Sequence, residues 1–168
     1  MTARFFDRKN GTGKPVLSKY GTYLRNTALV CIAYFAAGRV GLAAPFTSGN
    51  VSPVWPASGI ALSAVLLLGW RIWPGIALGA FLTNLLSPIP HIAAAGLALG
   101  NTLAALTGAF LLRRMRGFRP SLSRLMDILQ LVTLGALTSP IVSASIGVAN
   151  LFATHVQPWK VVPLAWLI

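Results

Sequence analysis

The sequence predicts an all-α protein, a polytopic bundle of transmembrane helices with about five spans, the start of a sixth span and a cytoplasmic N-terminus. Hydrophobic residues make up 55% of the 168 residues and charged residues only 10%, whereas a soluble domain carries about 25% charged residues. The mean hydropathy is +0.72. Long apolar runs alternate with short segments that contain proline, glycine or arginine, which is typical of a chain that crosses a membrane several times.

Five apolar runs are expected to form helices, at residues 26–44, 57–69, 74–87, 91–112 and 126–151. A sixth run, residues 161–168, is too short to cross a bilayer alone, because a span takes about 20 residues. We therefore expect an incomplete domain, as a fragment or a truncated copy. Residues 1–25 are polar and basic and contain Gly11, Gly13 and Pro15. This composition predicts a disordered cytoplasmic tail in front of an integral membrane domain at residues 26–168.

The second and third runs are each too short for a comfortable span. Two structures fit them: two short tilted helices that meet in an inner turn, or a re-entrant hairpin buried within protein. The turn between them reads GWRIWPG, where Trp70 and Trp73 flank Arg71. Aromatic and basic residues of this kind mark a membrane–water interface, which favours the two tilted helices.

The basic residues predict the orientation in the membrane. With the N-terminus inside, twelve of the 14 Lys and Arg residues face the cytoplasm, whereas the outer loops hold only Lys160 and the first helix holds Arg39. The net charge of +12 is thus a topology signal that also attracts anionic lipid headgroups. It does not indicate a nucleic-acid partner. The twelve residues are Arg4, Arg8, Lys9, Lys14, Lys19, Arg25, Arg71, Arg113, Arg114, Arg116, Arg119 and Arg124.

Small residues recur at four-residue spacing in three of the expected helices. Such a stripe lets neighbouring helices approach closely, although apolar helices are also simply rich in glycine and alanine. We expect a compact bundle in which these glycines lie at helix interfaces: Gly75, Gly79, Gly96, Gly100, Gly108, Gly135 and Gly147.

Four polar or aromatic residues are candidates for ligand binding. Arg39 lies inside an apolar helix, where a guanidinium must face a cavity, pair with a partner or extend to the interface. Trp55 stands between Pro53 and Pro56 at the outer end of the second helix, as a lid or as an interfacial anchor. Asn84 and Asn101 line a pocket or hydrogen-bond between the third and fourth helices.

The residue types argue against catalysis and metal binding. Cys31 is the only cysteine, so neither an internal disulfide nor a cysteine-based metal site is expected. His91 and His155 have no third ligand in the pattern, and no catalytic cluster appears. We expect no enzyme, no cofactor and no metal within these residues.

Several segments resemble the type 1 membrane-associated sensor domain, the MASE family. They are NVSPVWPASGIALSAVLLLGWRIWPGIALGAFLTNLL (50–86), AAGLALGNTLAALTGAFLLRRM (94–115), FRPSLSRLMDIL (118–129) and LTSPIVSASIGVANLF (137–152). The resemblance covers roughly residues 27–168, and its signatures follow one another at family-like spacing. One departure is Ala104, at a position where family members often carry Glu.

The resemblance implies a multi-pass input module of the bacterial inner membrane that detects an unknown stimulus. Its implied partners are the lipid bilayer, a second copy of the chain in a homodimer, and a cytoplasmic output domain, a histidine kinase or a diguanylate cyclase. Catalysis would reside in that output domain. The alternative is a small-molecule transport module, which would usually need an intramembrane acid or broken half-helices in two repeats. The sequence shows neither apart from the ambiguous pair of short helices.

Overall fold

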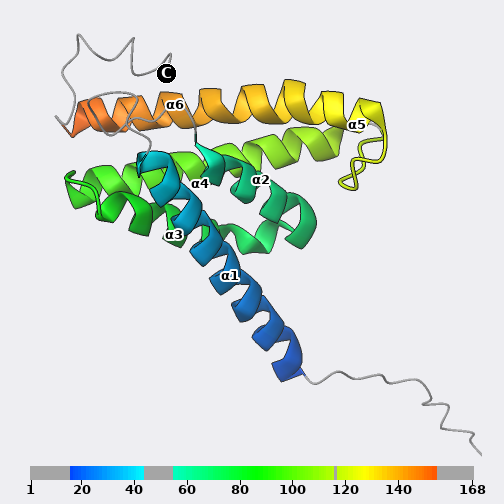
Figure 1. Ribbon diagram of the computed structural model, residues 1–168, viewed down its shortest axis with the longest axis horizontal. Helices are drawn as coiled ribbons and strands as arrows, with labels where there is room; N and C mark the ends of the chain where they lie inside the picture. The colour runs from blue at the N-terminus through cyan, green and yellow to red at the C-terminus, as the bar shows by residue number, and fades with distance from the viewer. Residues whose placement is uncertain (1–15, 44–54, 116, 155–168) are drawn as a thin grey trace, which may run out of the picture.

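The computed structural model describes residues 16–43, 55–115 and 117–154, which form helices joined by short turns (Figure 1). The predicted all-α fold is confirmed for these residues. Three stretches are long and apolar enough to cross a membrane: Lys19–Ala43, His91–Arg114 and Leu125–Asn150. The six α-helices are α1 (Val16–Ala43), α2 (Pro56–Leu68), α3 (Trp73–Leu85), α4 (His91–Arg114), α5 (Leu125–Gln130) and α6 (Ala136–Ala153). The predicted run at residues 161–168 lies outside the described residues.

Proline and glycine set the ends of the short helices. Pro56 is the first residue of α2, and a proline there loses no hydrogen bond because the first turn has no intrahelical acceptor for its N–H. The helix stops at Gly69, whose φ of 92° is readily adopted only by a residue without a Cβ. A 3₁₀ turn at Trp70–Ile72 then leads into α3, which has Pro74 in its first turn.

The first helix corrects the prediction of a disordered tail through residue 25. Helix α1 begins at Val16, so residues 16–25 form its first turns. Extending a helix costs far less than nucleating one, and the apolar residues that follow already nucleate α1. The Tyr23 hydroxyl also donates to the Arg71 carbonyl at 3.2 Å, which ties this extension to the α2–α3 connection. Residues 1–15 lie outside the described residues.

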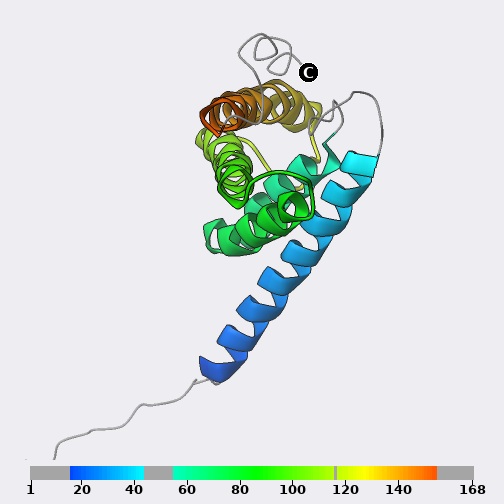
Figure 2. The same ribbon diagram turned by 90° about the vertical axis from the view of Figure 1, so that its left-hand side faces the viewer.

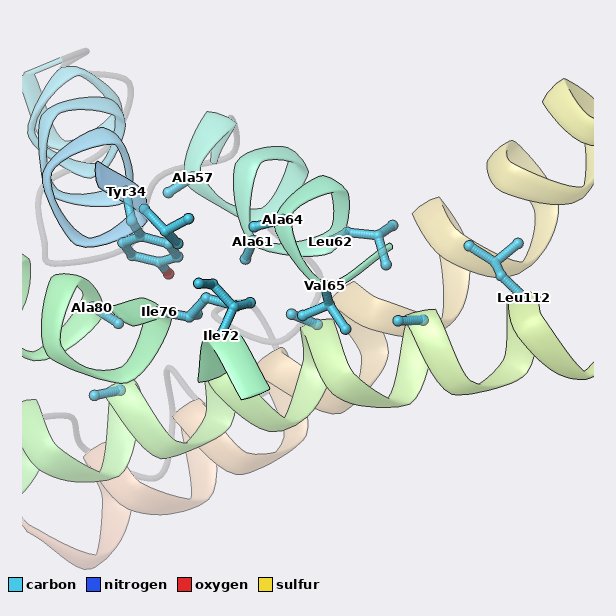
Figure 3. Packing of buried hydrophobic residues seen from close by; sticks show 14 residues of the cluster. Tyr34, Ala57, Ala61, Leu62, Ala64, Val65, Ile72, Ile76, Ala80 and Leu112 are labelled. Atoms are coloured by element: carbon cyan, nitrogen blue, oxygen red, sulfur yellow. The ribbon is translucent and has the colours of Figure 1, made fainter. Parts of the chain in front are cut away.

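The helices stack in a fixed order rather than closing into a ring. Helix α1 packs against α2 and α3, these two pack against α4, and α4 packs against α6; Figure 2 shows α1 and α6 on opposite sides of the stack. A buried cluster joins the first four helices, and Figure 3 shows Tyr34 of α1 beside Ile72 and Ile76, with α2 above them. Many members of this cluster are alanines, which allow the backbones to approach closely.

Helices α2 and α3 contain 13 residues each, or about 20 Å at 1.5 Å per residue. That is shorter than the hydrocarbon core of a bilayer, about 30 Å. Both lie between α1 and α4. Tilted spans and a re-entrant hairpin both fit this packing, and the count of five spans stays a prediction.

All seven glycines named from the sequence lie against neighbouring helices. A Cβ on Gly75 would lie 2.5 Å from the Thr27 carbonyl oxygen of α1, and one on Gly79 would lie 2.8 Å from the Cys31 carbonyl oxygen. Contacts this short are essentially never made by a real Cβ. Glycine therefore sets the distance between α1 and α3. Gly96, Gly100 and Gly108 face α6, Gly147 faces α4, and Gly135 faces Leu62 and Leu112.

The predicted helix at residues 126–151 is divided into three segments. Helix α5 is followed by a π-helical turn, Leu131–Gly135, and then by α6, which contains Pro140. A proline inside a helix has no N–H for the carbonyl four residues earlier, and π-turns commonly accompany such irregularities. The Asp127 carboxylate, which is buried, accepts the backbone N–H groups of Arg119 and Arg124. This pairing fixes the start of α5.

Candidate functional site

Trp55 lies at the N-terminus of α2, where it is half-buried. Its indole Nε1–H donates to the hydroxyl of Tyr34 at 3.3 Å, and its carbonyl accepts both the N–H and the Oγ–H of Ser58. Tyr34 belongs to α1 and is fully buried. A hydrogen bond thus joins the N-terminus of α2 to the C-terminal half of α1, which positions the indole ring within the protein.

Arg39 and Asn84 occupy different environments. Arg39 is exposed on α1 and forms no hydrogen bond or ion pair with the described residues. Asn84 is buried near the end of α3, and its Nδ2–H donates to the Ala80 carbonyl one turn earlier in the same helix at 2.8 Å. No hydrogen bond or ring contact between described residues links Arg39, Trp55, Asn84 and Asn101 to one another. Arg39 and Asn84 are chain neighbours of Gly38 and Thr83, which meet where α1 packs on α3, whereas Asn101 bonds to α6.

Asn101 belongs to a polar contact between α4 and α6. Its Oδ1 accepts the Ser143 Oγ–H at 2.7 Å, so Asn101 bonds to α6 and not to α3 as the sequence suggested. On either side, Ser139 Oγ–H donates to the Ala104 carbonyl at 3.1 Å and Asn150 Nδ2–H donates to the Ala93 carbonyl at 2.7 Å. We call these groups the α4–α6 polar interface.

The α4–α6 polar interface follows a single antiparallel register. The bonded positions run from Ala104 back to Ala93 on α4 while their partners run from Ser139 forward to Asn150 on α6. Glycines lie among the bonding residues, with Gly96 and Gly100 between Ala93 and Asn101 on α4 and Gly147 between Ser143 and Asn150 on α6. These glycines let the helices approach closely, so side chains reach backbone carbonyls directly. Hydrogen bonds between helices in a membrane contribute about 0.6 kcal/mol each on average. Three of them specify the register of α6 and hold it with modest energy.

Asn150, Tyr34 and Arg113 were missed by the sequence analysis. The spacing of Ser139, Ser143 and Asn150 places them on one helical face, and this pattern within an apolar helix was the available signal for Asn150. Tyr34 gives no comparable signal, because a tyrosine within an apolar run is ordinary. Arg113 is part of a loop-proximal basic run, yet its guanidinium donates to the carbonyls of Val65 and Leu66 at 2.9 and 3.0 Å.

These contacts bring three basic segments to one end of the stack. Tyr23 joins the N-terminal part of α1 to Arg71, and Arg113 joins the C-terminal turn of α4 to the C-terminal turn of α2. At the opposite end lie Ala43, Trp55 and Leu85. Within the described residues no group of three or more His, Cys, Asp or Glu is placed to hold a metal ion.

A stack of apolar helices with glycine-lined contacts and buried hydrogen bonds between helices defines an α-helical membrane protein. The sequence model of MASE1, membrane-associated sensor domain 1, matches residues 26–168. The chain belongs to this family, which confirms the resemblance seen in the sequence. No curated protein and no solved structure matches the chain.

Proposed function

We propose that this chain is a sensory input domain of the bacterial inner membrane that relays a stimulus to a cytoplasmic output domain, a histidine kinase or a diguanylate cyclase. Membership of the MASE1 family carries the proposal. The apolar helices long enough to cross a membrane support an integral, multi-pass domain. The domain itself performs no catalysis in this proposal, because the chemistry belongs to the output domain.

The N-terminus is cytoplasmic in this proposal. The basic residues near Tyr23, at Arg71 and at Arg113 gather at one end of the stack, and basic residues flanking short loops set the orientation of a membrane protein. Reporter fusions test this directly. A reporter fused after Arg116 should be active only when it is a cytoplasmic reporter, and one fused after Gln157 only when it is periplasmic. Swapped activity at either site would overturn the orientation.

The stimulus is relayed through the α4–α6 polar interface. Among the α-helices of the described part, α6 packs most extensively on α4, and this contact is the main route by which a stimulus that changes α4 reaches α6. The interface is held by few and modest hydrogen bonds. Breaking these hydrogen bonds would change the free energy of α4–α6 packing by an amount within the range of about 1–3 kcal/mol that couples sites in allosteric proteins.

The relay is tested in a fusion of the domain to a diguanylate cyclase whose product is measured in cells. Ser143→Ala and Asn150→Ala should each change the basal output severalfold while membrane insertion stays normal. Ser63→Ala is the matched control, since Ser63 is an exposed serine of α2 with no hydrogen bond to α6. If all three variants signal as the parent does, the interface is structural and this relay is refuted.

Stimulus recognition by Arg39 is tested in the same fusion. Arg39→Gln keeps a polar side chain but removes the charge, so the protein should insert normally and lose its response if the guanidinium binds an anionic stimulus. An unchanged response would show that Arg39 only extends to the membrane surface.

A further inference from the structure

Two guanidinium groups of the C-terminal turn of α4 lie over aromatic rings, one on α4 itself and one on the 3₁₀ turn that follows α2. The Arg113 guanidinium carbon lies 5.6 Å from the centroid of the Trp70 ring, and that of Arg114 lies 5.8 Å from the Phe110 ring. The two rings meet edge to face at 6.5 Å. We call these four side chains the basic aromatic patch.

Arg113 is held in a fixed position. Its Nη2 donates to the carbonyls of Val65 and Leu66 in the last turn of α2, and the Val65 carbonyl also accepts the N–H of Gly69. A guanidinium has five N–H donors, and the others of Arg113 make no hydrogen bond to the described residues. These donors are therefore available to an acceptor from outside the protein.

The charge of the patch is not neutralised by the protein. Asp127 is the only carboxylate side chain in the part of the chain that the structure describes, and it is buried and bonded to backbone N–H groups. The helix dipole places about half a negative charge at the C-terminus of each of α2 and α4. Together these partial charges offset one of the two guanidinium charges, which leaves about one net positive charge. Arg71, exposed on the α2–α3 connection, adds another.

Apolar surface borders the charged groups. Phe110 is 50% exposed and Leu67 is 71% exposed, and both lie within a turn of the residues that carry or receive the guanidinium contacts. Trp70 and Trp73 are also exposed, and tryptophans on the surface of membrane proteins are enriched at the headgroup level of a bilayer. A ligand for this surface thus has an anionic oxygen group and a long apolar part next to it.

The geometry points to a binding site for an anionic phospholipid at the basic aromatic patch. Arg113 and Arg114 bind the phosphate oxygens, for which the planar guanidinium group is well suited, and an acyl chain lies along Phe110 and Leu67. The lipid would link the last turn of α4 to the connection between α2 and α3. This site does not depend on which side of the membrane the patch faces.

Native mass spectrometry of the full chain in detergent tests the site, with phosphatidylglycerol and phosphatidylethanolamine as probes. The wild type should bind phosphatidylglycerol more tightly than phosphatidylethanolamine. The double variant R113Q/R114Q should bind phosphatidylglycerol about tenfold or more weakly, since each basic residue near anionic lipid contributes about a fivefold effect. The control K19Q/R25Q removes the same charge from α1 and should bind as the wild type does.

Three results would overturn the proposal. The first is an equal loss of phosphatidylglycerol binding in R113Q/R114Q and K19Q/R25Q. The second is equal binding of the two lipids by the wild type. The third is displacement of phosphatidylglycerol by glycerol 3-phosphate, which would show a site for a soluble phosphate. Arg114→Gln alone leaves the Arg113 contacts to α2 intact and should still weaken binding several-fold. If R113Q/R114Q does not fold, this single variant decides the question, and unchanged binding refutes the site. Swapped topology reporters would refute the proposed orientation and leave this result standing.

Discussion

The contact between Gly96 and Asn150 gives the sharpest prediction about the α4–α6 polar interface. A Cβ added to Gly96 would overlap the carboxamide group of Asn150, whose Nδ2–H donates to the Ala93 carbonyl. Gly96→Ala must therefore displace the carboxamide group and weaken that hydrogen bond. In the double variant G96A/N150A the carboxamide is gone, and with it the three atoms that lie nearest to the new methyl group.

The magnitudes follow from the two single changes. Inserting a methyl group into a packed contact costs about 1–3 kcal/mol of unfolding free energy. Asn150→Ala loses one interhelical hydrogen bond, worth about 0.6 and at most about 1.7 kcal/mol. If the effects were independent, the double variant would lose about 2–4 kcal/mol. We expect it to lose no more than Asn150→Ala alone, because alanine favours a helix over glycine by about 1 kcal/mol.

The assay is reversible unfolding in mixed micelles of increasing sodium dodecyl sulfate, followed by circular dichroism. Gly59→Ala serves as the control, because a Cβ on Gly59 of α2 meets nothing within 4 Å; this variant should be as stable as the wild type or slightly more so. A coupling free energy of about 1–3 kcal/mol between residues 96 and 150 is expected. Additive losses in the double variant would refute the close contact between α4 and α6.

Three further predictions use the same assay. Trp55→Phe should lower the unfolding free energy by about 1 kcal/mol through the lost bond to Tyr34, and adding Tyr34→Phe should cost little more; a second full loss would show that the two residues act separately. Asp127→Ala should cost about 1–2 kcal/mol, because two backbone N–H groups lose their acceptor at the start of α5, and an unchanged midpoint would contradict this role. Gly79→Ala should cost more than Gly100→Ala, because the former meets the Cys31 backbone at 2.8 Å and the latter meets the Ile146 side chain at 3.1 Å, which can shift; the reverse order would contradict the closer packing of α1 on α3.

The positions of the short helices could be predicted from sequence because local chemistry sets their ends. Helices α2, α3 and α4 begin within one residue of the predicted positions, since each starts at or next to a proline that fits the first turn. The start of α1 has no such signal. Its first ten residues are polar enough to resemble a tail, and their helical state depends on the helix that follows and on the contact of Tyr23 with a distant turn.

The candidate site could not be predicted in the same way, because side-chain partners depend on how helices are placed. Asn84 and Asn101 stand in similar apolar helices, yet the first bonds to its own helix and the second to a serine 42 residues away. Sequence identifies both as polar groups that need a partner. Which partner each finds is decided by the packing of α4 on α6 and of α3 on its neighbours.

The π-turn at Leu131–Gly135 has a consequence for how the chain tolerates changes of length. A π-turn holds one more residue than the α-helical path it replaces, while the side chains of the helices on either side keep their directions around the helix axis. Deleting one residue from this turn would leave a regular α-helix and keep Ser139, Ser143 and Asn150 directed at α4. A deletion between Ser143 and Asn150 would instead turn Asn150 by about 100° around the helix. Related sequences that differ in length within this helix are therefore expected to gain or lose their residue at Leu131–Gly135.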